Sequence, residues 1–369
     1  MSDSSAYRML VNSVIDYSLP VDTEWLIERI KYSKRVITVG TGRSGDVAEV
    51  LMRFLRNLGI DYSYGPNDLP YILGPCDLTI AFSGSGSTYY TVEVARAAKR
   101  GSGFLASITS NVSSPLSALS DKTILIPGAS LKESDHFANQ ITGISKVPLT
   151  PMGTLFELRS LLFSLSLVSQ LRGFGISEAH KSLVEGILGF NPKAESYSDI
   201  YKLLPKASKG FEYKKIVIIG EGLSGIVGKF FATRLRHCSK PDEERHVSFW
   251  LDKGSVSIKK GDVIFIISGS GGGVTPNLAK RSREKGAKVV SLTSFKDSEL
   301  ASNSDYVMEI PGRIKMNLKG LRTSYYPQDP MYSIFELRTL FFLETLIYYL
   351  ANADGITEND MRLMHSDFT

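Results

Sequence analysis

Short runs of β-branched and other apolar residues alternate along this chain with amphipathic stretches whose apolar positions recur close to every 3.6 residues. The runs lie at 36–39, 78–82, 104–108 and 123–126, and again at 216–219, 263–267, 288–292 and 306–310. Strands that are apolar on both faces and separated by helices are typical of a parallel sheet built from right-handed crossovers. The pattern therefore predicts an α/β fold.

The series of elements occurs twice, about 180 residues apart. The clearest paired segments are 35–45 with 215–225, 80–86 with 265–271, and 151–161 with 330–340. This period is far longer than that of a solenoid repeat, so it indicates a duplicated domain. We expect one domain at 1–190, which includes an N-terminal helix, and a second at 191–369. Polar residues around Asn191-Pro192 interrupt the periodicity over 190–208, and each half closes with a long apolar helix, at 155–172 and 334–351.

Composition excludes several classes of protein. Hydrophobic residues make up 43% of the 369 residues, the net charge is only +5, and the basic residues are not clustered, which disfavours nucleic-acid binding. Cys76 and Cys238 lie outside any metal-ligand spacing, which argues against zinc and disulfides and for a reducing compartment. The start of the chain does not read as a signal peptide, and the most apolar segment is too short to span a bilayer. We expect a cytoplasmic protein that does not bind membranes.

A glycine-rich turn follows the first strand of each half. Gly40-Thr-Gly42-Arg-Ser-Gly45 in the first half has the form G-x-G-x-x-G, and residues 220–225 repeat it. This form is compatible with a dinucleotide site, which also needs an acidic residue at the end of the second strand. Asp61 is roughly so placed, whereas the second half offers acidic residues only in a charged loop, so the nucleotide alternative is the weaker one.

A hydroxyl-rich turn follows a later strand in each half. It reads Ser83-Gly-Ser85-Gly-Ser87-Thr88 in the first half and Ser268-Gly-Ser270-Gly in the second. Hydroxyls and backbone N–H groups that converge at a helix N-terminus can hold a phosphate monoester without a metal. The alternative is an ordinary strand-to-helix turn, but the recurrence of the motif favours a phosphate site.

A glutamate stands near the start of each closing helix, at Phe156-Glu157 and Phe335-Glu336. If Thr154 and Ser333 are N-caps, both glutamates lie near position N3, and a capping box explains them. The other interpretation is a general base that faces a sugar site.

Taken together, these motifs resemble the SIS (sugar isomerase) domain family, once in each half, with 6-phospho-3-hexuloisomerases as the nearest branch. The resemblance rests on 40–45, 83–88, 151–157 and the ending His365-Ser-Asp-Phe368. It implies two flavodoxin-like, five-stranded parallel sheets between helices, no cofactor and no metal. It also implies pairing of the two SIS domains within the chain, with a homodimer possible, and a sugar phosphate as the small-molecule partner.

The resemblance also assigns roles to residues. In such isomerases, which are intramolecular oxidoreductases, a glutamate moves a proton between adjacent carbons through a cis-enediol(ate), and a histidine opens the ring or shuttles a proton. The candidate catalytic residues are Glu157, Glu336 and His365. The candidate phosphate ligands are Ser44, Ser83, Ser85, Ser87, Thr88, Ser224, Ser268 and Ser270, and further substrate contacts are Gly42, Arg43 and Gly222. Aldose–ketose or ketose–ketose isomerisation of a hexose or hexulose 6-phosphate is the leading interpretation.

The second half departs from the family pattern. Gly272 and Gly273 replace the hydroxyls of Ser87 and Thr88, Leu223 replaces Arg43, and Tyr332 replaces Gly153. In the first half, the position equivalent to His365 falls near Glu185. The two sites need not be equal. Phosphoglucose/phosphomannose isomerase, aminosugar-phosphate isomerase or deaminase, and a non-catalytic phosphosugar sensor therefore stay open as alternatives.

Overall fold

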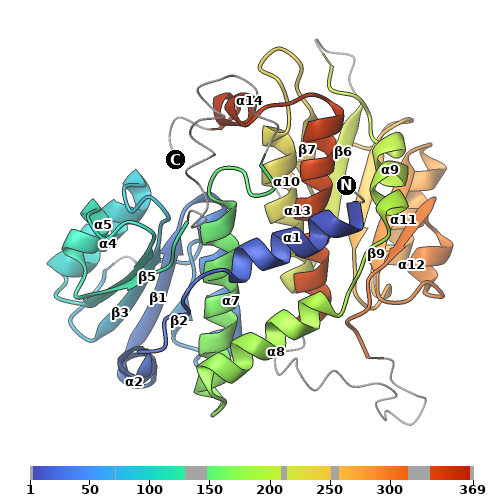
Figure 1. Ribbon diagram of the computed structural model, residues 1–369. Helices are drawn as coiled ribbons and strands as arrows, with labels where there is room; N and C mark the ends of the chain where they lie inside the picture. Colours follow the sequence, from blue (N-terminus) through green and yellow to red (C-terminus); the bar gives the residue numbers. More distant parts are fainter. Residues whose placement is uncertain are drawn as a thin grey trace, which may run out of the picture. The chain divides into compact units, whose positions relative to one another are not determined.

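The computed structural model describes residues 3–70, 72–128, 148–208, 214–250, 257–314 and 333–365. The described residues fall into two compact units (Figure 1). One holds those of 12–138 and 152–184, and the other those of 1–11, 139–151 and 185–365. Helix α1 (Asp3–Ile15) contributes residues to both units. Tyr332 and the end of the chain after His365 lie outside the described residues.

The first unit is built on a five-stranded parallel sheet in the order β2-β1-β3-β4-β5. Its strands are β1 (Arg35–Gly40), β2 (Ser63–Tyr64), β3 (Asp77–Phe82), β4 (Phe104–Thr109) and β5 (Lys122–Leu125). Its helices are α2 (Glu24–Tyr32), α3 (Gly42–Asn57), α4 (Tyr89–Arg100), α5 (Pro115–Leu119), α7 (Thr154–Leu171) and most of α8 (Ile176–Leu188). All six residues of β3 are buried, and five of them form the run at 78–82 that predicts a central parallel strand.

The second unit repeats this topology, with the sheet order β10-β9-β8-β6-β7. Its strands are β6 (Lys215–Gly220), β7 (His246–Phe249), β8 (Val263–Ile267), β9 (Lys288–Thr293) and β10 (Tyr306–Glu309). Its helices are α9 (Ala194–Leu203), α10 (Gly222–His237), α11 (Thr275–Glu284), α12 (Glu299–Ser302), α13 (Ile334–Ala353) and α14 (Glu358–Leu363). The α/β fold and its duplication are confirmed.

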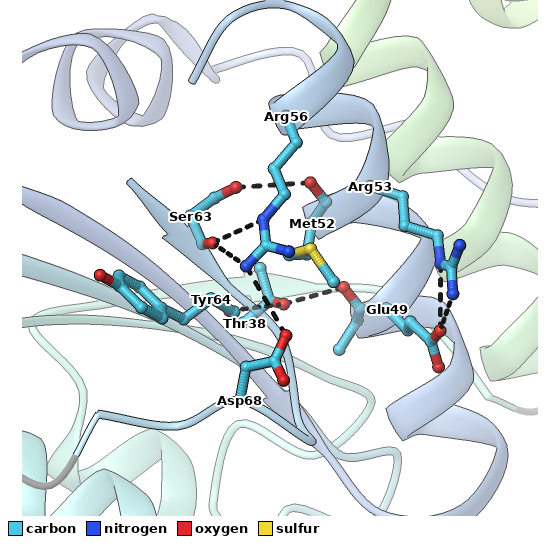
Figure 2. Close-up of polar contacts among 9 residues, drawn as sticks. Thr38, Glu49, Met52, Arg53, Arg56, Ser63, Tyr64 and Asp68 are labelled. Carbon is cyan, nitrogen blue, oxygen red and sulfur yellow. Dashed lines mark hydrogen bonds and ion pairs between the residues drawn. The ribbon is translucent and has the colours of Figure 1, made fainter. Parts of the chain in front are cut away.

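The edge strands β2 and β7 were not predicted from the pattern of apolar residues. Strand β2 has only two residues, and an arginine of the adjacent helix holds it in place (Figure 2). The Arg56 guanidinium donates to the Ser63 carbonyl at 2.8 and 3.0 Å and lies 3.6 Å from the Asp68 carboxylate. Arg236 donates to the Val247 carbonyl of β7 in the same way. Backbone pairing with β1 and β6 joins these strands to their sheets, and an arginine ties each strand to the helix before it, so hydrophobic periodicity alone does not reveal them.

The segment between the halves differs from its prediction. The sequence predicted that the helical periodicity is interrupted over 190–208, but helix α9 lies within this segment. Pro192 precedes the first residue of the helix. Tyr197 and Ile200 of α9 are fully buried, and the Tyr197 ring stacks on Phe342 of α13 at 4.9 Å. With only two buried positions in ten residues, the apolar face of α9 is short, and the polar residues around it kept the helix from being recognised in the sequence.

The closing helices α7 and α13 are buried on nearly every side, so they form the core of their own units. Buried serines interrupt the apolar surface of α7, and Ser164 and Ser166 each donate to the carbonyl four residues earlier, at 2.7 and 2.8 Å. Within the described part of the chain, no helix has the length and apolarity needed to span a membrane.

Candidate functional site

The three glycines of the first turn each meet a backbone requirement. Gly42 has φ of +56°, a left-handed conformation that glycine adopts readily. A Cβ on Gly40 would lie 2.6 Å from the Ser44 carbonyl oxygen, and one on Gly45 would lie 2.8 Å from the Gly40 oxygen. Strand β1 and helix α3 therefore meet too closely for a side chain. The second half repeats this geometry at Gly220, Gly222 and Gly225.

The hydroxyl-rich turn of the first half joins β3 to α4. Ser83 is buried, and its hydroxyl accepts from the Gly86 amide at 3.1 Å and lies 3.1 Å from the Thr88 hydroxyl. Ser85 and Ser87 are exposed and joined by a hydrogen bond of 3.0 Å between their hydroxyls. The turn thus combines a buried hydroxyl network with two hydroxyls that face solvent at a helix N-terminus.

A second hydroxyl-bearing segment, after β4, braces this turn. Thr109 and Ser110 both donate through their hydroxyls to the Gly84 carbonyl, at 3.2 and 2.6 Å. Beside them, Ser114 caps α5 by accepting from the Ser117 amide. The segment at 107–110 is echoed at 291–294, but nothing in the sequence indicates that it braces the turn.

Gly86 is the tightest point of the turn, and its replacement tests this packing. Its φ is +67°, and a Cβ there would come within 2.0 Å of the Ser114 hydroxyl oxygen. We expect Gly86→Ala to lower the free energy of unfolding by about 3 kcal/mol, because it adds crowding to left-handed strain. The control is Gly59→Ala, where φ is +82° and the space is open, with an expected loss of about 1 kcal/mol. Equal losses in urea denaturation would contradict the packing argument.

The turn of the second half joins β8 to α11 and carries fewer hydroxyls. The Ser270 hydroxyl accepts from the Gly272 amide at 3.3 Å, as Ser85 accepts from the Ser87 amide at 3.2 Å. Ser268 is half-buried, and Thr275 in the first turn of α11 donates to the Gly272 carbonyl at 2.7 Å. The backbone of the turn is retained, but its set of side chains differs from that of the first half.

The candidate base of the first half pairs with an arginine. Glu157 lies in the first turn of α7, and its Oε2 is 3.0 Å from Nε of Arg43 in the first turn of α3. Arg43 is almost fully buried, whereas the Glu157 side chain keeps 13% of its exposure. Gly153 and not Thr154 occupies the N-cap of α7, so of the two interpretations of Glu157 the capping box does not apply.

Glu336 of the second half has a different pair of neighbours. Its Oε1 accepts from the Ser224 hydroxyl at 2.9 Å and pairs with the Arg313 guanidinium. Ser333 does occupy the N-cap position of α13. Ser224 was predicted as a phosphate ligand, and in the structure its hydroxyl donates a hydrogen bond to Glu336.

Two buried arginines, each two residues after the glutamate along the closing helix, were missed from the sequence. Arg159 donates to the Pro127 carbonyl at 2.7 Å, and Arg338 donates to the Pro311 carbonyl at 2.6 Å. Each arginine thus ties the segment after the last strand of its sheet to the closing helix. The signal was present, because the repeated segments read Phe-Glu-Leu-Arg in both halves.

His365 lies at the far end of α10 from the glutamate of its own unit. Its ring centroid is 5.0 Å from that of His237, the last residue of α10. Ser224, which contacts Glu336, lies 13 residues earlier on the same helix, so about 20 Å of helix separates the two places. Within the second unit the structure does not bring His365 to Glu336.

Two further features concern metal-ligating side chains and a buried thiol. Among the described residues, no group of three or more histidine, cysteine, aspartate or glutamate side chains is placed to hold a metal ion. Burial raises the pKa of the Cys238 thiol to about 12, so at neutral pH it stays protonated and unreactive.

A model of the SIS domain matches this chain twice, at residues 29–139 and 211–329. A protein of Methylomonas aminofaciens named 3-hexulose-6-phosphate isomerase is 34% identical over 179 residues, which are 48% of this chain and 90% of that relative. A protein of Bacillus subtilis with the same name is 32% identical over 142 residues, which are 38% of this chain and 72% of that relative. Each of these matches covers half of this chain or less, as expected for a duplicated domain.

Solved structures match over the whole chain. Tagatose-6-phosphate ketose/aldose isomerase from Escherichia coli superimposes with a TM-score of 0.64 at 14% identity, over 98% of this chain and 95% of its own. Glucosamine-6-phosphate deaminase from Thermotoga maritima gives a TM-score of 0.58 at 17% identity, over 97% and 96% of the two chains. At these identities the likeness establishes a shared fold.

Proposed function

This chain belongs to the SIS domain family, and we propose that it isomerises a sugar phosphate, with a hexulose or hexose 6-phosphate as substrate. The relatives named 3-hexulose-6-phosphate isomerase support this substrate class. About a third of the aligned residues are identical, over 48% and 38% of this chain.

The observation that carries the proposal is the pairing of Glu157 with Arg43. The Glu157 carboxylate is largely shielded from water and lies beside the Arg43 guanidinium, which holds it in place to accept a proton as a general base does. The two residues stand at the starts of α7 and α3, in the unit that also holds the hydroxyl-rich turn of 83–88. A base and a phosphate-binding turn are what an isomerase of phosphorylated sugars requires.

In the proposed reaction, Glu157 removes a proton from the carbon next to the substrate carbonyl. The electron pair of the broken C–H bond forms the C=C bond of a cis-enediolate, and the carbonyl oxygen takes the negative charge. Arg43 stabilises that charge. Glu157 then returns the proton to the former carbonyl carbon, while the proton of the adjacent hydroxyl moves to the enediolate oxygen, so that this hydroxyl becomes the new carbonyl. The exposed hydroxyls of Ser85 and Ser87 hold the phosphate, with Ser83 and Thr88 shaping the turn. The role of His365 in ring opening stays a prediction.

A panel of sugar phosphates tests the proposal. We expect hexulose 6-phosphate to turn over, and at about 100 times its Kd to raise the melting temperature by about 5 °C. Fructose, glucose, mannose and glucosamine 6-phosphates complete the panel, with unphosphorylated fructose as the control. Turnover of glucosamine 6-phosphate alone would replace the proposal with an aminosugar reaction. Heat protection without turnover would indicate a sensor. If no sugar phosphate gives either heat protection or turnover, both the isomerase and the sensor hypotheses are refuted.

A further inference from the structure

The second half keeps a glutamate–arginine pair although its sequence lacks the arginine of the first half. Leu223 occupies the place of Arg43 in the first turn of the helix that follows the first strand. The structure supplies the cation from another element, because Arg313 follows β10 and pairs with Glu336. The equivalent position of the first half is Ala129. The arginine has therefore changed its place in the fold while its partner glutamate has kept its own.

The backbone around Arg313 is fixed in position by several contacts. The Arg313 amide donates to the Ser294 hydroxyl at 3.1 Å, and Arg338 holds the Pro311 carbonyl at 2.6 Å. Gly312 lies against the start of α13, where a Cβ would be 2.5 Å from the backbone of Phe335. The guanidinium also lies over the Phe335 ring, 5.7 Å from its centroid. Arg313 is thus aimed at Glu336 by its own segment.

Arg313 also lies against the hydroxyl-rich turn. A Cβ on Gly269, within the turn of 268–273, would meet Nε and Cγ of Arg313 at 2.6 and 2.7 Å. The Arg313 side chain keeps 29% of its exposure, whereas that of Glu336 keeps 5%. Arg313 therefore reaches from the turn to Glu336 and is partly open to solvent. A counter-charge that served only to offset burial of Glu336 would not need contact with the turn.

We propose that Arg313 does for Glu336 what Arg43 does for Glu157, so that the second half is a second working site. This inference rests on the proposed function, because it assigns that reaction to both halves. In the second half Arg313 holds Glu336 in place, and it stabilises the enediolate oxygen when the proton leaves the substrate carbon. The replacement of Arg43 by Leu223 then marks a relocated arginine and not a lost site.

The test isolates the second half in the full chain with Glu157→Gln, which removes the base of the first. In this background we expect Arg313→Ala to lower kcat about 100-fold and to change KM less than about threefold. Adding Leu223→Arg places an arginine where the first half has one. We expect this addition to raise kcat at least about tenfold above that of the variant with Arg313→Ala. The control is Arg283→Ala, an exposed arginine of the same unit that pairs with Asp305.

Three outcomes overturn the inference. Glu157→Gln alone could leave turnover undetectable while Glu336→Gln leaves it intact, in which case the second half does not work although the proposed function stands. Arg313→Ala could lower the melting temperature and leave kcat unchanged, in which case the arginine is structural. Absence of turnover in the unmodified chain would refute the proposed function itself. If Arg313→Ala does not fold, Arg313→Lys replaces it, with an expected loss of about tenfold in kcat and none if the inference is wrong.

Discussion

Replacing both candidate bases in one chain, by Glu157→Gln and Glu336→Gln, is expected to lower kcat about 1,000-fold. Glutamine keeps the shape of the side chain and can still accept hydrogen bonds from Arg43, Ser224 and Arg313, but it cannot take the proton from carbon. General-base catalysis contributes about 10²- to 10⁴-fold, so removal of both bases should bring turnover near the background. The measurement is steady-state turnover of hexulose 6-phosphate, together with exchange of the substrate carbon-bound hydrogen in deuterated water.

A buried glutamate outside the proposed machinery provides the matched control. Glu49 of α3 is 6% exposed and pairs with Arg53 at 2.7 Å, one turn further along the same helix (Figure 2). Glu49→Gln changes the same chemical group at a similar burial, so any loss caused by burial alone should appear there as well. If the double variant keeps more than about a tenth of the turnover, the glutamates are not the bases.

The architecture was predictable because it is encoded locally and twice. A strand such as β3 is apolar at consecutive positions, and the repeated order of strands and glycine turns allows only a duplicated α/β fold. The exceptions have physical causes. Strand β2 depends on the Arg56 guanidinium, and α9 depends on the burial of Tyr197 and Ile200, which no local period indicates.

The candidate site was predictable only in part. The turn of 83–88 and the two glutamates are contiguous motifs, so the sequence displays them directly. Their partners come from distant segments. Arg43 was named as a substrate contact, but its pairing with Glu157 joins positions 114 residues apart, and no spacing rule brings them together. Pairs of this kind are products of the sheet topology, which sets the starts of α3 and α7 close together.

Arg313 shows most clearly which part of the site the sequence does not predict. A comparison of the two halves position by position finds an arginine missing at Leu223 and gives no reason to look 90 residues further on. Only the packing of 311–313 on Gly269 and Phe335 shows that the charge is present. A substitution that seems to disable a site can therefore be offset elsewhere in the fold, and sequence motifs alone underestimate such a site.

Arg159→Ala is expected to lower the free energy of unfolding by about 4 kcal/mol. Arg159 is fully buried and donates to the carbonyls of Val14, Ser13, Asp16 and Pro127 at 2.7–3.0 Å. Its guanidinium also lies 5.0 Å from the Tyr17 ring centroid. Each buried carbonyl left without a donor costs about 1–3 kcal/mol, partly recovered when water enters. Urea denaturation followed by circular dichroism measures the loss.

Two further variants separate the causes of that loss. Arg96→Ala breaks an exposed pair of the same unit, with Glu93, and should cost about 0.5 kcal/mol, because exposed ion pairs contribute little. Arg159→Met fills most of the vacated volume but donates no hydrogen bond, so we expect it to remain at least about 2 kcal/mol less stable than the unmodified chain. If methionine restores full stability, Arg159 acts by packing. The segment at Pro127 would then be held to α7 by contact area and not by the carbonyl bonds that are repeated at Arg338.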